Sequence, residues 1–434
     1  MTHPSSTPNA TTWSADKHRI RVELLAMWLC GGSYFVQFLA MAFASFPLQT
    51  HLRKLLEPSQ ASLVAGLIPI ATCSTYLLFR VAESKQWTRF PQRSLAIAIV
   101  LLAVFQWVLG WKVNGVDAGY WLVGPAFDTG ACLLLMGCAN ASCMILLNHI
   151  AIATLNETAY VVRAAGTAGY MVAVVLLGVF WTDNESLEHS HLFVASTVSV
   201  IHAVLAWVGV WTLGYPHSDT VGHSAENASV GIVGQKEPQP AKQGSNLTWW
   251  GLLLLVWMVA MCEMAYALYS HEFVTKVYGS FGYYLFAAGL ALEIALLLLV
   301  SRAATLRSRL LFLGPLGWMC LMIGGLLADG GLPSFGALTL AMALNCPFQM
   351  SVSEHVHRID ARVLGIASVS LAQSLGYLSA AGLSALVSRV STGPRNLWLC
   401  MIPVATLAML LSVWKMRRMR SQTDSCAAGP IESD

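Results

Sequence analysis

Three carboxylates lie inside long apolar stretches, where a charge is expensive. Asp128, Glu263 and Glu293 each occur in a stretch with no Lys or Arg in its interior. An ionised carboxylate at the middle of a bilayer costs at least about 2.5–3.5 kcal/mol on insertion scales. Without a cation nearby, such a group should spend part of its time protonated. These residues could therefore take up and release a proton inside a membrane, or each could instead face a water-filled vestibule or a neighbouring hydroxyl without any coupling role.

Uncharged polar side chains are concentrated in a few of the apolar stretches. If two bundles of helices surround a central cavity, the first helix of each triplet lines that cavity and the third faces lipid. The distribution follows this division except for Gln106 in the third stretch and His202 in the sixth, and we interpret His202 as structural. The residues that we expect to contact a small polar solute are Tyr34, Gln37, Asn140, Asn345, Gln349 and Gln373.

The composition places these stretches in lipid. Of the 434 residues, 56% are hydrophobic and only 11% are charged, against about 25% charged in soluble chains. A net charge of +3 is too small to indicate a nucleic acid as partner. The sequence contains no phosphate-binding loop and no H-E-x-x-H run, so we expect no cofactor, no metal and no enzyme activity. Residues 353–357 (Ser-Glu-His-Val-His) have a metal-like composition, but we interpret them as a loop.

Twelve stretches are long enough to cross a bilayer, which requires about 20 mostly apolar residues. The fold class that we predict is therefore all-α integral membrane, with twelve transmembrane helices in two pseudo-symmetric six-helix bundles. The predicted spans are Arg21–Leu48, Ala61–Phe79, Ser94–Trp111, Gly119–Ile152, Val161–Trp181, His191–Leu213, Trp249–Ser270, Phe281–Ser301, Leu310–Ala328, Leu332–Met350, Val363–Val387 and Leu397–Trp414.

A polar connection divides these spans six and six. The predicted domains are a tail (1–20), an N-terminal bundle (21–213), a linker (214–248), a C-terminal bundle (249–414) and a second tail (415–434). Cytoplasmic loops are enriched in Lys and Arg. If the N-terminus is cytoplasmic, 19 of the 25 basic residues fall on that side and six on the other. We therefore predict that both tails and the linker are cytoplasmic.

Several short motifs resemble the major facilitator superfamily, and within it the nucleoside:proton symporters, with the lactose permease-like carriers behind them. The clearest is residues 163–170 (Arg-Ala-Ala-Gly-Thr-Ala-Gly-Tyr), after residues 147–150 (Leu-Asn-His-Ile). Weaker matches are residues 29–34, residues 81–83, Glu263 and residues 291–294. The resemblance, together with the small-residue spacing, suggests that Glu83, Arg163, Gly166 and Gly169 serve gating or helix packing.

The resemblance implies the major facilitator fold and a carrier function. We expect a monomeric, multi-pass protein of the plasma (inner) membrane that takes up nucleosides together with protons. Glu293, Glu263 and Asp128 are the candidates for proton coupling. The alternatives are a sugar or aromatic-acid proton symporter and, from another class, a transporter-like sensor or an integral-membrane enzyme.

Overall fold

The computed structural model describes most of the chain as helices. The described residues are 10–45, 66–84, 91–114, 125–155, 158–180, 190–212, 245–279, 282–328, 331–387 and 394–427. The first half forms α1 (Ala10–Ser45), α4 (Leu67–Ser84), α5 (Pro91–Asn114), α6 (Pro125–Leu155), α7 (Ala159–Phe180) and α8 (His191–Thr212). The second half forms α9 (Ser245–Tyr278), α10 (Gly282–Arg302), α11 (Ala304–Leu327), α12 (Leu332–Ala343), α13 (Asn345–Ile359), α14 (Val363–Val387) and α15 (Pro394–Ala427).

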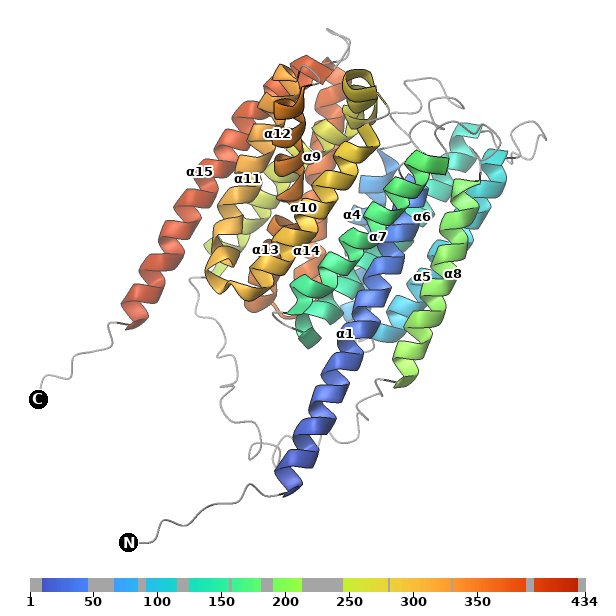
Figure 1. Cartoon of the computed structure of the whole chain (residues 1–434), viewed down its shortest axis with the longest axis vertical. Helices are drawn as coiled ribbons and strands as arrows, with labels where there is room; N and C mark the ends of the chain where they lie inside the picture. Colours follow the sequence, from blue (N-terminus) through green and yellow to red (C-terminus); the bar gives the residue numbers. More distant parts are fainter. Residues whose placement is uncertain are drawn as a thin grey trace, which may run out of the picture.

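The helices form two bundles that lie side by side (Figure 1). The N-terminal bundle contains α1 to α8, and the C-terminal bundle contains α9 to α15. Between them, α7 packs along α10 and α4 packs along α14. The first turn of α1 and the last turn of α15 lie at the same end of the molecule, which we call the terminal end. This placement agrees with an even number of membrane crossings.

The helices match the predicted spans closely. Eleven segments of the described residues are long and apolar enough to cross a membrane, and one of them, Leu332–Ile359, combines α12 and α13. The helix α4 occupies the position of the second predicted span, whose first residues, 61–65, lie outside the described residues. With α4 included, the described residues are almost entirely helical and provide a helical segment for each of the twelve predicted spans.

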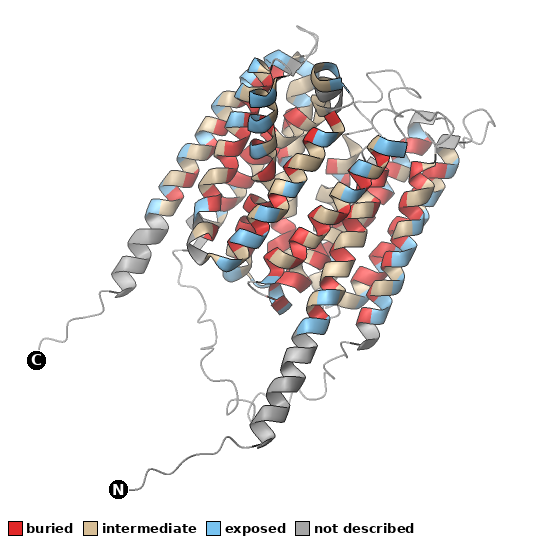
Figure 2. Cartoon of the chain, in the orientation of Figure 1, coloured by how far each residue is buried: buried red, intermediate tan, exposed pale blue. Residues whose placement is uncertain are grey.

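The N-terminal bundle has exposed residues on its outer helices (Figure 2), and many of those on α5 and α8 are large and apolar. On α5, Ile97, Val100 and Val104 are exposed, and on α8, Ile201 and Val204 are exposed. In a bilayer such surfaces need no protein partner, because lipid tails are as apolar as the side chains. The predicted lipid-facing role of the third and sixth spans is consistent with this exposure.

Some helix ends differ from the predicted boundaries, most of all at the two ends of the chain. The helix α1 begins at Ala10, inside the predicted tail, and α15 continues to Ala427. Most of the predicted linker, residues 214–244, lies outside the described residues. The interpretation of residues 353–357 as a loop is wrong, because they form the last turns of α13. Ser353, Glu354 and Val356 are buried in the protein.

The tenth span is interrupted at Leu344, between α12 and α13. Pro347 explains the interruption, since it has no backbone N–H and its ring would clash with the carbonyl of Ala343 in a continuous helix. The next bond of the new helix runs from the Phe348 N–H to the Leu344 carbonyl, at 3.2 Å. On the neighbouring α11, Gly314 lies so close to Phe348 that a Cβ there would collide with the ring. The break therefore sits at a fixed place in the middle of the C-terminal bundle.

Candidate functional site

Glu293 of α10 lies at the contact between the two bundles. Its side chain is buried, at 8% exposure, and its Oε1 accepts a hydrogen bond from the Thr167 hydroxyl of α7, at 2.7 Å. The backbone and thiol of Cys346, at the start of α13, also hydrogen-bond to this carboxylate. A carboxylate in this position can hold the bundles together by accepting bonds from both, and protonation would weaken that hold.

Arg163 of α7 is the cation beside this carboxylate. Its guanidinium is close enough to interact electrostatically with Glu293, and its Nε donates to the Cys346 sulfur at 3.0 Å. The guanidinium also lies 4.0 Å from the ring centre of Phe38 and 5.6 Å from that of Tyr34, which is a cation–π arrangement. Its Nη1 is buried and has no hydrogen-bond partner among the described residues.

A small polar cavity of about 40 Å³ lies between the bundles next to Arg163. This volume holds a few water molecules but no nucleoside or sugar. The bundles must therefore separate before a solute can occupy the site. The lining residues are Asn148, Arg163, Val256, Gln349, Met350, Ser353, Ile366, Val369, Ser370 and Gln373.

Glu263 of α9 is surrounded by amides of its own bundle. The Asn345 amide donates to its Oε1 at 3.1 Å, and Gln349 and Gln373 donate to its Oε2 at 3.3 and 3.4 Å. Tyr377 also hydrogen-bonds to this carboxylate, and Gln373 donates to the Tyr377 hydroxyl at 2.6 Å. Three predicted solute-binding residues and a predicted proton-coupling residue thus form one group, which we call the amide cage: Glu263, Asn345, Gln349, Gln373 and Tyr377.

The other predicted solute-binding residues form hydrogen bonds inside the N-terminal bundle. The Tyr34 hydroxyl donates to Asn148 at 2.6 Å, beside the cavity. Gln37 donates to Asn140 at 2.8 Å, and its own carbonyl oxygen lies 3.0 Å from His202 Nδ1. Gln37 and His202 are fully buried. The Gln37 group is therefore set back from the cavity, and only Tyr34 touches a residue that lines it.

Asp128 differs from the other two carboxylates because, among the described residues, it forms a salt bridge with a lysine. Its Oδ2 lies 3.2 Å from Lys112 Nζ, near the ends of α6 and α5 that lie away from the terminal end. The sequence interpretation assumed that no cation was within reach, and this premise does not hold. An ion pair stabilises the ionised carboxylate, so the physical argument for proton coupling at Asp128 is lost.

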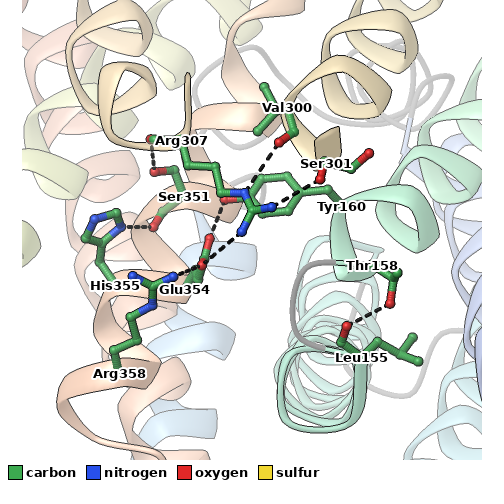
Figure 3. Close-up of polar contacts among 10 residues, drawn as sticks. All are labelled: Leu155, Thr158, Tyr160, Val300, Ser301, Arg307, Ser351, Glu354, His355 and Arg358. Atoms are coloured by element: carbon green, nitrogen blue, oxygen red, sulfur yellow. Dashed lines mark hydrogen bonds and ion pairs between the residues drawn. The ribbon is translucent and has the colours of Figure 1, made fainter. Parts of the chain in front are cut away.

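At the terminal end, a polar contact closes the space between the bundles (Figure 3). The Tyr160 hydroxyl of α7 donates to Glu354 Oε2 of α13 at 2.8 Å. Glu354 also pairs with Arg358 one turn later and lies 3.8 Å from Arg307 of α11. Arg307 in turn caps the end of α10, donating to the Ser301 carbonyl at 3.1 Å. We call this contact between Tyr160 and Glu354 the inner latch.

A second cross-bundle contact lies at the same end. Glu83 of α4 is 3.8 Å from Arg362, which precedes α14 and also bonds to Asp360 at 2.8 and 2.9 Å. Burial opposes ionisation of Asp360, but the hydrogen bonds from Arg362 outweigh it and lower the pKa of that carboxyl. Arg362 is 65% exposed, so its pair with Glu83 contributes little by itself.

Gly166 and Gly169 of α7 lie against α1. A Cβ at Gly166 would lie 3.0 Å from the Phe38 ring and 3.3 Å from the Tyr34 side chain. At Gly169 a Cβ would collide with the carbonyl of Phe35. Close approach of these two helices, which only glycine permits, places the Tyr34 and Phe38 rings against Arg163.

Sequence reasoning missed four residues that complete this arrangement. Thr167 and Asn148 lie in the motifs that resemble the family, but the sequence did not indicate that they bond to Glu293 and Tyr34. Cys346 was not singled out from the sequence, and Glu354 was placed in a loop. The available signal was Pro347, because a proline inside an apolar span marks backbone that must be satisfied by neighbouring groups.

The comparisons with known proteins support the fold. No protein-family model and no curated protein sequence matches the chain. Among solved structures, a mutant of the nucleoside transporter NupG is similar with a TM-score of 0.60 and 14% identity, covering 90% of this chain and 99% of that one. Another NupG structure has a TM-score of 0.56 and 13% identity, covering 90% and 98%. The transporter FucP in its outward conformation has a TM-score of 0.61 and 13% identity, covering 91% and 99%. The chain therefore has the fold of major facilitator transporters.

Proposed function

We propose that the protein is a secondary transporter that takes up a nucleoside together with protons by alternating access. The observation that carries the proposal is the polar cavity between the bundles, with Arg163 and Glu293 beside it on opposite bundles. The unsatisfied Nη1 of Arg163 supplies a donor for a solute oxygen or ring nitrogen. NupG, a nucleoside transporter of similar fold, makes nucleosides the first solutes to test.

Alternating access would open and close the cavity from each side in turn. We infer that the inner latch closes the cytoplasmic side of the protein, since the distribution of Lys and Arg favours a cytoplasmic terminal end. We also propose that the protein lies in the plasma (inner) membrane. Protonation of Glu293 would neutralise the carboxylate that accepts the bond from Thr167 and attracts Arg163, and so would loosen the bundle contact. One proton moving down a potential of 100 mV supplies about 2.3 kcal/mol, enough for roughly fifty-fold accumulation.

A sugar is the second candidate solute, and one observation favours it. The described residues that line the cavity include amides and serines but no aromatic ring. Nucleobases are usually bound with a stacking partner, whereas sugar hydroxyls need donors and acceptors such as Asn148, Gln349 and Gln373. Tyr34 could stack on a nucleobase only if it gave up its hydrogen bond to Asn148 and its cation–π contact with Arg163.

Uptake into proteoliposomes tests the proposal. Purified protein is reconstituted, and labelled uridine, adenosine, glucose and benzoate are offered separately with acid outside and with no pH gradient. We expect a nucleoside to accumulate in the acid gradient and to leak out when a protonophore is added. Accumulation of glucose or benzoate instead would show that the protein transports a different solute from the one proposed. If every solute only equilibrated and none accumulated, the proposed proton coupling would be contradicted. Failure of any solute to enter would contradict transport.

A further inference from the structure

A single helix, α13, contacts both buried carboxylates and the inner latch. At its start, Asn345 bonds to Glu263 and Cys346 bonds to Arg163. Nine residues later, Glu354 accepts the bond from Tyr160 of the other bundle. At a rise of 1.5 Å per residue, these two ends are about 14 Å apart. Because α13 is a regular helix of 15 residues, a displacement of one end also displaces the other end.

The backbone of α13 is set off from that of α12 because the chain is interrupted at Leu344. The bond that Pro347 cannot make is one that would otherwise join the two helices. Gly314 of α11 lies beside Phe348, so the backbone of α11 comes close to the pivot without a side chain in the way. Interruptions of this kind are common hinge points in helices.

The amide cage anchors the start of α13 to Glu263. Two of its three amide donors, Asn345 and Gln349, belong to α13, and the third, Gln373, belongs to α14 with Tyr377. No cation forms an ion pair with Glu263 among the described residues. The hold on α13 therefore depends on hydrogen bonds to an ionised acceptor, which are about twice as strong as those to a neutral one.

We propose that α13 is a lever that pivots at Leu344 and transmits the charge state of Glu263 to the inner latch. When Glu263 is neutral, Asn345 and Gln349 lose their charged acceptor, the start of α13 shifts, and Glu354 withdraws from Tyr160. The purpose of the lever rests on the proposed transport function. The mechanical coupling itself is a property of the protein alone and can be measured without a solute.

The test follows the distance between α6 and α13 near the latch. His149 and His357 face each other there from opposite bundles, with ring centres 5.8 Å apart. In H149C/H357C protein, a short bifunctional thiol reagent would join the two positions, and mass spectrometry of the linked peptides would separate this link from those of native cysteines. Adding Glu263→Gln should slow the linking about threefold or more, because it mimics the neutral carboxyl.

Proline variants show whether the interruption carries the effect. Pro347→Ala restores the missing donor and should make α12 and α13 one helix, so the effect of Glu263→Gln on linking should disappear. Pro403→Ala is the matched control, since Pro403 lies inside the uninterrupted α15, and it should leave the effect unchanged. An effect of Glu263→Gln that persists in Pro347→Ala protein would overturn the lever.

A second cysteine pair separates a lever from rocking of whole bundles. E83C/R362C reports the contact between α4 and the start of α14, which does not include α13. The lever predicts that Glu263→Gln changes linking of the His149 and His357 positions and leaves the second pair unchanged. Equal changes at both pairs would show that the bundles move as rigid bodies. If Glu263→Gln protein does not fold, Asn345→Ser cuts the same connection and should slow linking in the same way.

The outcome is independent of the transport assays. If solute uptake is normal but Glu263→Gln has no effect on linking near the latch, the lever is contradicted and the proposed transport function is not. If Glu263→Gln slows linking near the latch but the protein transports none of the tested solutes, the lever is supported and its role in transport is contradicted.

Discussion

The surroundings of Glu293 and Glu263 differ in which bundle supplies the partners. Glu293 is bonded by Thr167 and approached by Arg163, both of the N-terminal bundle. Glu263 is bonded only by amides and a tyrosine of its own bundle. A carboxylate between moving parts changes its partners when the parts separate, whereas one inside a bundle keeps them. The first is therefore suited to couple a proton to the opening of the cavity, and the second to hold one helix of its bundle in place.

The largest effect is expected from removing Arg163, the cation that lies beside Glu293 and has no counterpart beside Glu263 among the described residues. Arg163→Gln should weaken uridine binding by about tenfold or more, because a charged hydrogen bond is worth about 1.5–3 kcal/mol. Isothermal titration of purified protein would measure the change. Arg163→Lys is the control, since it keeps the charge without the planar fork and should lose less. Equal uridine affinity in wild-type and Arg163→Gln protein would remove Arg163 from the binding site.

Glu263→Gln should have a smaller effect on uptake. Its amide partners can rearrange around a neutral side chain of the same shape, so we expect a reduction in the uptake rate of about three- to tenfold, the weight of one or two hydrogen bonds. Accumulation of the solute in response to the proton gradient should remain, with a lower initial rate of uptake. Complete loss of accumulation, with normal amounts of folded protein, would show that Glu263 rather than Glu293 carries the proton.

Asp128→Asn should have the smallest effect on transport. The pair with Lys112 lies at the end of the helices away from the latch, so its loss should change the uptake rate by less than about twofold, although it should lower the thermal stability of the protein. Uptake rates and a melting curve in detergent would measure both. A proton-coupling role for Asp128 would instead appear as uptake that no longer responds to the pH gradient.

Much of the fold could be predicted from the sequence because lipid imposes a simple rule. Each span must be long, apolar and internally hydrogen-bonded, so hydropathy alone locates it. The spans from His191 and Val363 begin at the predicted residues. The error at residues 353–357 has a clear cause, since hydropathy cannot distinguish a polar helix end covered by protein from a polar loop. Tyr160, the residue of the other bundle that bonds to Glu354, lies 194 residues earlier in the chain.

The site was harder to predict, because its key contacts join distant segments. The sequence identified Glu293 and Glu263 as costly groups, and it identified the amides that bind Glu263 as polar residues without assigning them to that carboxylate. The bond between Thr167 and Glu293 spans 126 residues and depends on how α7 packs along α10. The pair of Lys112 and Asp128 was within reach of the sequence, since both lie at the same end of consecutive helices.

Proton movement accompanying solute uptake in Glu293→Gln protein tests the central claim most directly. Proteoliposomes that contain a pH-sensitive dye are given external uridine with no imposed gradient, and the acidification inside is recorded. Wild-type protein should acidify the lumen as uridine enters. Glu293→Gln should exchange labelled for unlabelled uridine but should move no protons, because the amide cannot be ionised. Acidification by Glu293→Gln at the wild-type ratio of protons to uridine would contradict the assignment of Glu293 as the coupling residue.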